Sequence, residues 1–271
     1  MAKAPLSFLE KGLHDFGRAR LFWGDAMELL ADLPEEVSLT LTSPPYNVGL
    51  DYNSYSDDRA WQDYLNWLGE IFSRTFRATG EGGRLVVNVP YMVKFSHKKR
   101  YFPLPDYQTL LEEAGFVLVD QIVWVKARTE QELLGVAGRS TAWGSWLSPS
   151  SPYARPVHEL LLVAKKPGGR KGQRGDITPE EFKLYTTSAW FIPSASHPIH
   201  PAVFPEELVR RAVKLYTSPD DVVFDPFMGV GTVGKVAVSL GRRFIGAEVD
   251  DVYFYHAMKE VEDACFALTV K

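Results

Sequence analysis

Short apolar segments alternate with segments of helical periodicity along most of this 271-residue chain. Strands separated by amphipathic helices are typical of an α/β fold built on a mostly parallel sheet. One neighbouring pair of strands has no convincing helix between its members, which predicts an antiparallel pair joined by a long insert. The predicted strands are 20–24, 37–41, 84–89, 116–126, 157–165, 222–225 and 243–249, and the predicted helices are 26–33, 61–77, 105–114, 205–215, 231–240 and 251–268. Segments 1–18, 127–156 and 176–204 are expected to be mostly irregular.

The composition places the chain among ordinary globular proteins. We expect residues 1–271 to form one domain, and a hydrophobic content of 45% is enough for its core. The single cysteine, Cys265, excludes a disulfide framework and fits a reducing, cytoplasmic compartment. No apolar run approaches the length of a membrane span, so no membrane partner is expected. Because the net charge is −4, any contact with nucleic acid must depend on local clusters of positive charge.

The segment Ser43-Pro44-Pro45-Tyr46 closely follows the predicted strand 37–41. Two consecutive prolines end a strand and leave a stiff, extended peptide with outward-facing carbonyl groups. The Ser43 hydroxyl and the Pro44 carbonyl can accept hydrogen bonds from an NH2 group, while the Tyr46 ring can stack on a planar molecule. The segment therefore predicts a site for a planar group that carries an amine. The alternative is that the prolines merely terminate the strand.

A glycine-rich segment, Asp225–Thr232, lies between a predicted strand and a predicted helix. Glycines at such a turn let the backbone approach a ligand, and the helix N-terminus offers free N–H groups. Glu248 ends the next predicted strand, where a carboxylate can bind ribose hydroxyls. The same pattern fits a dinucleotide-binding fingerprint, although few residues follow it. It fails as a phosphate-binding P-loop because Val236 stands where a Ser or Thr should bind the metal.

These two motifs, in this order, resemble those of S-adenosylmethionine-dependent DNA amino-methyltransferases of the circularly permuted β group. The resemblance runs roughly from Arg20 to the C-terminus and includes segments 122–126, 158–159 and 200–205. It implies a Rossmann-like, circularly permuted α/β sheet of seven strands, in the order 3-2-1-4-5-7-6, with the seventh strand antiparallel. Both motifs would then lie at the carboxyl edge of adjacent strands, where ligands bind in open α/β sheets.

The resemblance implies that S-adenosylmethionine is the cofactor, and that double-stranded DNA is the partner and presents a flipped base. Acceptors around an exocyclic amine draw its protons out of the ring plane and make its lone pair available. The implied catalytic residues are Ser43, Pro44, Pro45 and Tyr46, and no metal is needed. The implied cofactor-binding residues are Asp25, Phe204, Asp225, Phe227, Gly229, Gly231, Thr232 and Glu248. Asp25 is alternatively only a helix cap.

Ser43 also bears on the target atom. In the family, Ser at this position goes mostly with methylation of cytosine N4, and Asp goes mostly with methylation of adenine N6. We therefore expect site-specific methyl transfer to N4 of cytosine in DNA, with adenine N6 and a structured RNA as alternatives. A nucleotide-binding oxidoreductase and a non-catalytic cofactor-binding module are further alternatives. No Pro-Cys pair is present, which argues against methylation at cytosine C5, a reaction that needs a thiolate.

Two dense runs of positive charge are the predicted phosphate contacts. They comprise Lys94, Lys98, Lys99 and Arg100 in one run, and Lys165, Lys166, Arg170, Lys171 and Arg174 in the other. The inserts 127–156 and 166–200 are the candidate target-recognition region. Trp143 and Trp146 in the first insert are either core anchors or base-stacking groups. The resemblance also raises a homodimer and a cognate restriction enzyme as partners.

Overall fold

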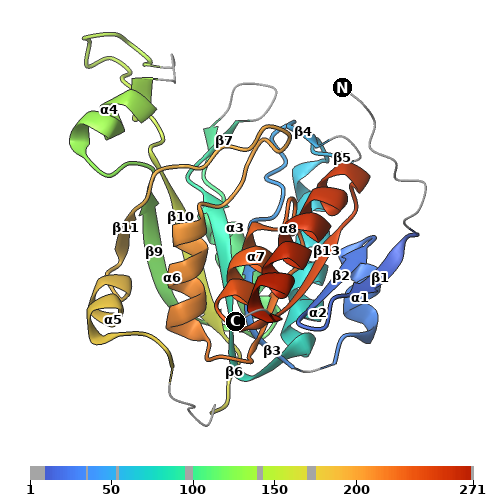
Figure 1. The fold of residues 1–271 in the computed structure, drawn as a ribbon. Coiled ribbons are helices and arrows are strands. Elements are labelled where there is room, and N and C mark those ends of the chain that lie inside the picture. Colours follow the sequence, from blue (N-terminus) through green and yellow to red (C-terminus); the bar gives the residue numbers. More distant parts are fainter. Residues whose placement is uncertain are drawn as a thin grey trace.

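The computed structural model describes residues 10–34, 36–52, 55–94, 100–138, 143–169 and 175–269, which Figure 1 shows as a ribbon. The strands of the main sheet are β1 (Gly12–Asp15), β2 (Ala19–Trp23), β3 (Val37–Thr42), β6 (Thr79–Pro90), β9 (Val117–Val125), β10 (His158–Lys165), β11 (Ala189–Phe191), β12 (Val222–Asp225) and β13 (Arg243–Glu248). Their order across the sheet is β1-β2-β13-β12-β3-β6-β10-β9-β11. Two short antiparallel pairs lie outside it, β4 (Asp51–Tyr52) with β5 (Tyr55–Ser56) and β7 (Val93–Lys94) with β8 (Arg100–Tyr101).

The sheet order confirms the predicted permuted methyltransferase fold. Without the edge strands β1 and β11, it reads as the expected 3-2-1-4-5-7-6, with β12 as the first strand. β10 runs antiparallel to both β6 and β9, as predicted for strands 157–165 and 116–126. The other neighbouring pairs among these seven strands are parallel. The permutation is visible because β12 and β13, late in the chain, lie between the early strands β2 and β3.

Helices cover both faces of the sheet (Figure 1). One face carries α6 (Glu206–Tyr216), α7 (Thr232–Ser239) and α8 (Asp251–Thr269), and the other carries α1 (Ala26–Asp32), α2 (Trp61–Ala78) and α3 (Leu104–Glu113). Successive residues of a strand point to opposite faces, so Val223 packs in one core while Val222 and Phe224 pack in the other. A strand buried on both faces is apolar at every position, which is why its sequence lacks alternation.

Several of the described elements differ from the sequence-based expectation. β1, in the segment expected to be irregular, pairs with β2 at the sheet edge. β6 begins at Thr79, so the glycines after α2 extend the strand and do not form a loop. Helix α4 (Glu130–Gly138) occupies part of the first insert, and helix α5 (Pro179–Tyr185) occupies part of the second. The Thr178 side chain caps α5 together with Glu181, and this capping-box pattern was readable in the sequence.

The strand directions bring several chain segments to one edge of the sheet. The carboxyl ends of β2, β13, β12, β3 and β6 meet there because these strands are parallel. β10 runs the other way, so its first residues reach the same edge, where Glu159 stands opposite Pro90 of β6 and Trp124 of β9. Among the described residues, no helix is long and apolar enough to cross a membrane.

Candidate active site

A cavity of about 590 Å³ opens at the carboxyl edge of the sheet. Ser43–Tyr46 after β3 form one part of its wall, and Asp225–Val230 after β12 form another. Its volume lies within the range of small-molecule and cofactor sites. The structure thus brings the two sequence motifs together. The cavity wall includes each of Ser43, Pro44, Pro45, Tyr46, Asp25, Phe204, Asp225, Phe227, Gly229, Thr232 and Glu248.

Glu248 holds the glycine loop in place. One carboxylate oxygen, Oε2, accepts a hydrogen bond from the Gly229 N–H at 2.9 Å, and Oε1 accepts one from the Asp250 N–H at 2.8 Å. Burial raises the pKa of Glu248 to about 7, although these backbone donors oppose the shift. Because each oxygen has a further lone pair, a carboxylate so placed can still accept hydrogen bonds from hydroxyl groups in the cavity.

Gly231 is not among the residues that line the cavity, and its predicted contact with the cofactor stays a prediction. Its φ of 86° is in the left-handed region, and it caps the N-terminus of α7. A Cβ at this position would lie 2.8 Å from the Cα of Ala257 in α8, on the helix side of the loop. The glycine is therefore required for the turn and for helix packing.

Asp25 and the aromatic residues around Phe227 form the end of the cavity beside β2. Asp25 is the N-cap of α1, where its side chain accepts a hydrogen bond from the Met27 N–H at 2.8 Å. It also lines the cavity, so capping and ligand contact are compatible.

Phe227 packs against Trp67 of α2 with ring centroids 5.4 Å apart, and the Arg59 guanidinium lies 4.9 Å from the Trp67 ring. Trp67 and Arg59 also line the cavity, and the sequence did not single them out.

His200 forms a neutral wall beside the glycine loop. Its Nδ1 accepts a hydrogen bond from the Ala202 N–H at 3.1 Å, and its ring packs against Tyr253 at 4.5 Å. Burial lowers the pKa of His200 to about 4, so the imidazole is uncharged near neutral pH. Within the described ranges, no group of three His, Cys, Asp or Glu side chains is arranged to hold a metal.

The other end of the cavity carries a network of five polar side chains. The Ser43 hydroxyl donates to the Tyr46 hydroxyl at 3.1 Å, and the Tyr46 hydroxyl donates to Glu159 Oε2 at 3.3 Å. Asn88, near the end of β6, donates from Nδ2 to Tyr46 at 2.5 Å and to Glu159 at 2.6 Å. Lys126 forms an ion pair with Glu159 Oε1 at 2.5 Å. The network fixes the hydroxyls of both motif side chains at the cavity wall.

Asn88 was not predicted as a site residue from the sequence, and Lys126 and Glu159 were recognisable there only as parts of segments that resemble the family. A weak signal was available for the latter two, since they stand at the end of β9 and at the start of β10. Only the antiparallel pairing of β10 places Glu159 next to the end of β6.

The chain after Tyr46 is held by the buried side chain of Asp57. This carboxylate accepts hydrogen bonds from the backbone N–H groups of Asn47, Val48 and Leu50 at 2.7, 3.0 and 3.2 Å. Burial raises the pKa of Asp57. Asn47 adopts a left-handed φ of 57°, which turns the chain immediately after the Pro-Pro segment. The loop therefore presents Tyr46 from a fixed backbone.

The structure separates the two predicted basic runs. Lys94 in β7 and Arg100 in β8 follow the carboxyl end of β6, whereas Lys98 and Lys99 lie outside the described residues. Lys165 stands opposite Arg84, six residues along β10 from Glu159, which is roughly 20 Å from the cavity edge at the usual rise per residue. Lys166 is used internally, since its Nζ donates to the carbonyls of Phe76 and Thr79 at 3.1 and 2.7 Å. Arg170, Lys171 and Arg174 lie outside the described residues.

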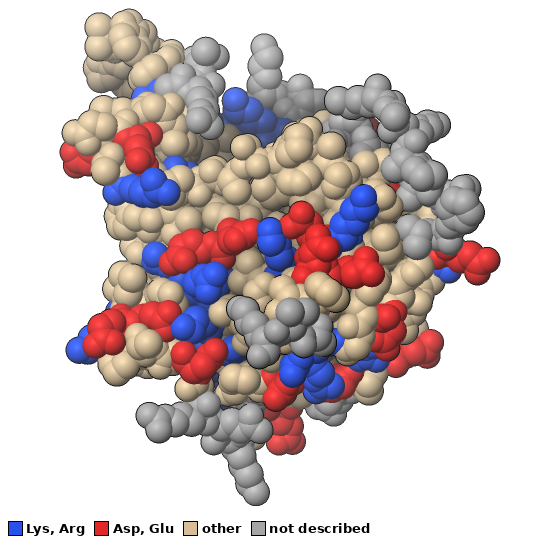
Figure 2. Space-filling model, in the orientation of Figure 1, with Lys and Arg blue, Asp and Glu red and all other residues tan. Residues whose placement is uncertain are grey.

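The first insert projects from the body at the carboxyl edge, carrying α4 (Figure 1). Trp143 and Trp146 pack edge to face at 4.8 Å and are 40% and 64% exposed, so neither is a core anchor. Arg155 lies 3.4 Å from the Trp143 ring centroid, and Arg100 stacks on Tyr153 at 4.2 Å. Among the described residues at the tip of this arm, Figure 2 shows mostly uncharged side chains, whereas acidic and basic residues are interleaved over the region of α6–α8.

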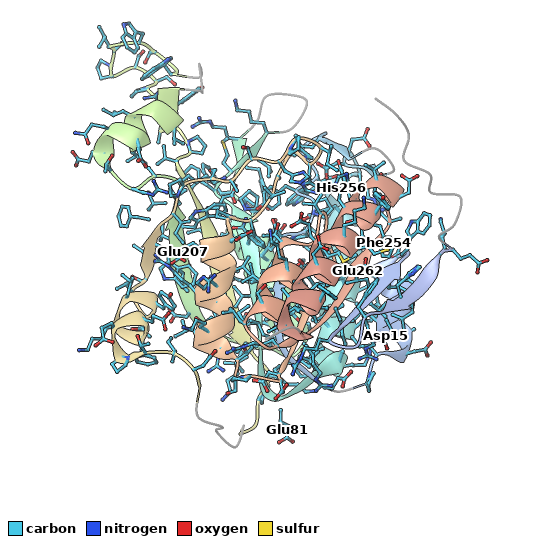
Figure 3. All side chains as sticks on the ribbon, viewed as in Figure 1. Asp15, Glu81, Glu207, Phe254, His256 and Glu262 are labelled. Carbon is cyan, nitrogen blue, oxygen red and sulfur yellow. The ribbon has the colours of Figure 1, made fainter. Side chains whose placement is uncertain are left out.

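The second insert is divided between the two ends of the sheet. Helix α5 packs against α6 away from the cavity, where Glu181 pairs with Lys214 at 2.5 Å. Ser194–His197 and His200 return to line the cavity. Figure 3 places His256 near the start of α8, and its ring lies 6.0 Å from that of His197. Among the described residues of this insert, the later part is therefore the one beside the site.

Comparisons with known proteins agree with this geometry. The profile of the N6_N4_Mtase family, described as DNA methylase, matches residues 37–259. Type II methyltransferase M.BglII of Bacillus subtilis is 29% identical over 263 residues, which cover 92% of this chain and 69% of that protein. The structure of TTHA0409 from Thermus thermophilus, complexed with S-adenosyl-L-methionine, has a TM-score of 0.71 and 29% identity over 90% of this chain and 93% of that one. PvuII DNA methyltransferase, described as cytosine-N4-specific, has a TM-score of 0.68 over 92% of this chain and 90% of that one, and its 20% identity shows the shared fold alone.

The family match spans most of the chain, and the protein therefore belongs to the DNA methylase family. Its activity is S-adenosylmethionine-dependent methylation of DNA. The cavity residues fit this cofactor. The carboxylates of Glu248 and Asp25 can accept hydrogen bonds from hydroxyl and amino groups, and Phe227 offers an apolar face for a planar ring. Lys235, the lysine of the P-loop-like pattern, forms ion pairs with Glu206 and Glu260 on neighbouring helices.

Proposed function

We propose that this protein methylates N4 of a cytosine that has been flipped out of double-stranded DNA, at a specific site. The observation that carries the proposal is that Ser43 and Pro44 share one cavity with the glycine loop and Glu248. An amine donor site and a cofactor site in one cavity allow the two reacting groups to be held in line. A base within a duplex cannot reach such a cavity, so the target nucleotide must leave the stack.

The end of the cavity lined by Ser43–Tyr46 binds the flipped nucleobase and activates its amine. The bound cofactor supplies a methyl group on a positively charged sulfur. The Ser43 hydroxyl oxygen and the Pro44 carbonyl accept hydrogen bonds from the exocyclic NH2 and draw its protons out of the ring plane. The same oxygens stabilise the positive charge that develops on nitrogen. The Tyr46 ring stacks on the base, and its hydroxyl is anchored by Asn88 and Glu159.

The opposite end of the cavity holds the cofactor. We assign Glu248 to the ribose hydroxyls and Asp25 to the adenine amine. Phe227 packs on the adenine ring, and the loop around Gly229 approaches the ligand with its backbone. Phe204, Asp225 and Thr232 complete the wall. Gly231 is left out of this set because a Cβ at this position would point to α8.

The choice of cytosine rests on Ser43, because serine at this position accompanies cytosine N4 methylation in most of the family. A hydroxyl accepts from the amine and also donates, as Ser43 does to Tyr46 at 3.1 Å. Adenine presents the same NH2 beside a ring nitrogen, so adenine N6 is the alternative target. Nucleoside mass spectrometry of DNA methylated by the purified enzyme tests the choice. We expect N4-methylcytosine, and N6-methyladenine alone would overturn the base assignment.

We propose that DNA lies along the carboxyl edge of the sheet. Lys94 and Arg100 lie at this edge with the arm formed by the first insert. The exposed aromatic residues of the arm suit contact with bases, and the basic loop between β7 and β8 suits contact with phosphates. Target recognition is assigned to the first insert and to the cavity-lining part of the second. The homodimer and the cognate restriction enzyme stay predictions.

A further inference from the structure

We propose that Glu159 is the terminal proton acceptor of the methylation reaction, reached from the target amine through the hydroxyls of Ser43 and Tyr46. The proposal rests on the proposed function only in requiring that an exocyclic amine is methylated, and it holds for cytosine and for adenine. Glu159 does not touch the reacting atoms in this scheme. It is a relay and positioning residue.

The hydrogen bonds of Tyr46 determine the direction of the relay. Its hydroxyl has one hydrogen, and atoms of Ser43, Asn88 and Glu159 lie within hydrogen-bond distance of it. The Asn88 amide nitrogen can only donate, and the Glu159 carboxylate can only accept. The Tyr46 hydrogen therefore points to Glu159, and its oxygen receives the hydrogen of Ser43. Asn88 Nδ2 also donates to the Ser43 oxygen in a long contact of 3.5 Å, so one Ser43 lone pair is left for an amine in the cavity.

Asn88 supports this direction because its amide is oriented by the same two neighbours. Nδ2 lies 2.6 Å from Glu159 Oε2 and 2.5 Å from the Tyr46 hydroxyl, so reversing the amide would place two acceptor oxygens against each other. Asn88 is 2% exposed, and within the described part of the chain its Oδ1 has no hydrogen-bond partner. Buried polar atoms are usually hydrogen-bonded. The Asn88 amide leaves Oδ1 without a partner while Nδ2 donates to Tyr46 and Glu159, which indicates that these two residues determine its orientation.

The surroundings of Glu159 hold its side chain in place while leaving it at the cavity wall. Lys126, which directly follows β9, pairs with Glu159 Oε1 at 2.5 Å, and the Glu159 side chain retains 15% exposure. Burial lowers the pKa of the neighbouring His158, so this ring is neutral near physiological pH. Tyr107 of α3 is within electrostatic range, and its pKa is raised, chiefly by burial, so it stays protonated. Asp57 and Asp106, which also act on Tyr107, are further acidic groups near this end of the cavity.

The reaction moves one methyl group to the amine and one proton from the amine to Glu159. As the N–CH3 bond forms, the S–CH3 bond breaks, and the sulfur keeps the bonding electron pair. The amine nitrogen is then a cation carrying one proton too many. This proton moves to the Ser43 oxygen, the Ser43 hydrogen moves to Tyr46, and the Tyr46 hydrogen moves to Glu159. The products are a neutral methylated amine and a protonated Glu159, which returns its proton to solvent between turnovers.

The test compares Glu159→Gln and Tyr46→Phe with the unmodified enzyme in single-turnover reactions, at saturating cofactor and duplex, over the pH range in which all stay folded. Gln keeps the size of Glu but cannot take a proton, and Phe keeps the stacking ring but breaks the relay. We expect each variant to lose rate by on the order of 100-fold. The double variant should lose no more than either single variant, because both interrupt one chain. Glu181→Gln is the matched control, since Glu181 also pairs with a lysine but lies away from the cavity.

The pH profile separates relay from structural support. The rate ratio between the unmodified enzyme and Glu159→Gln should shrink toward one at acidic pH, because a carboxylate relay accepts protons less readily there. Calorimetric affinity for the cofactor and fluorescence-anisotropy affinity for the duplex should be unchanged in both variants. A rate ratio that is constant with pH, additive losses in the double variant, or an unchanged rate would overturn the relay. Failure of the proposed function is distinct, because the unmodified enzyme would then methylate no amine in DNA.

Discussion

Thr42 donates a hydrogen bond of 2.7 Å to Asp225, a residue 183 positions later in the chain. Thr42 is the last residue of β3 and Asp225 is the last residue of β12, and these parallel strands are neighbours in the sheet. Both side chains are buried. The contact joins the residue before Ser43 to the first residue of the glycine-rich motif. It therefore sets the amine site and the cofactor site side by side.

The first prediction concerns this buried carboxyl. Burial raises the pKa of Asp225 from 3.8 to about 7, so the folded protein binds its proton more tightly than the unfolded chain. The resulting stabilisation is complete at pH values below the pKa of Asp225 in the unfolded chain. It is lost as pH rises through the pKa of Asp225 in the folded protein. Asp225→Asn lacks this titration but can still accept from Thr42. The unfolding free energy of the native protein minus that of the variant should fall by up to about 4 kcal/mol as pH rises between these two pKa values.

Denaturant unfolding at several pH values measures this difference. The nearby Glu248 titrates in the same range, but it is present in both proteins and largely cancels in the comparison. A difference that does not change with pH would show that Asp225 is ionised in the folded state throughout.

The second prediction is a pH-dependent cofactor affinity. Burial raises the pKa of Glu248 to about 7, and an ionised carboxylate accepts hydrogen bonds from ribose hydroxyls more strongly than a protonated one. Affinity should therefore weaken as pH falls below this value. Glu248→Gln should weaken binding by about 1–3 kcal/mol at alkaline pH and flatten the dependence. Calorimetric titration checks both effects, with Glu260→Gln on the outer face of α8 as the control for removal of a negative charge.

The third prediction concerns Gly231 of the glycine loop and uses Gly241, which follows α7, for comparison. Gly231→Ala should lower the melting temperature even without cofactor, because its Cβ would lie 2.8 Å from the backbone of α8 at a φ of 86°. The strain should cost about 1–3 kcal/mol. Gly241→Ala has a similar φ of 77° but open space around its Cβ, so it isolates the cost of the backbone conformation alone. Equal losses for the two variants would show that contact with α8 is unimportant.

The fourth prediction concerns DNA. Replacing the basic residues of the β7–β8 region should weaken binding to all duplexes alike and reduce the salt dependence, by about 0.9 in log–log slope for each phosphate that is no longer neutralised. The residues to neutralise are Lys94, Lys98, Lys99 and Arg100. Neutralising Lys165, Arg170, Lys171 and Arg174 serves as the comparison, and Lys166 is kept because it anchors backbone carbonyls. A larger change in slope for this second set would place DNA at the opposite edge.

The fold was largely predictable because its signals are local. Apolar runs ended by Gly, Pro or Asp marked the strands, and apolar periodicity marked α2, whose buried residues Tyr64, Leu68 and Phe72 recur every four positions. The order of the two motifs then implied the permuted sheet. The capping box of α5 was an overlooked local signal, whereas β1 is a short strand of alternating burial that pairs with β2 at the sheet edge.

The site was only partly predictable, since a side chain's neighbours depend on pairing between distant strands. The chemistry of Ser43-Pro44-Pro45-Tyr46 was evident from its residue types, and the carboxylate position of Glu248 followed from a strand end. The direction in which Gly231 faces depends on α8, and the remoteness of Lys165 depends on β10 running antiparallel. A count of positive charges cannot distinguish one edge of a sheet from the other.

By itself, the sequence determined the class of fold, the two motifs and their chemistry, because strand length, helical period and the geometry of proline and glycine act within a few residues. Only the tertiary structure decided that Asn88 and Glu159 meet at Tyr46 and that Lys126 pairs with Glu159. Asn88 lies in β6, Glu159 lies in β10 and Lys126 directly follows β9. Hydrogen bonding across the sheet at a particular register brings their side chains within bonding distance. Register is a property of paired strands, so no single segment contains it.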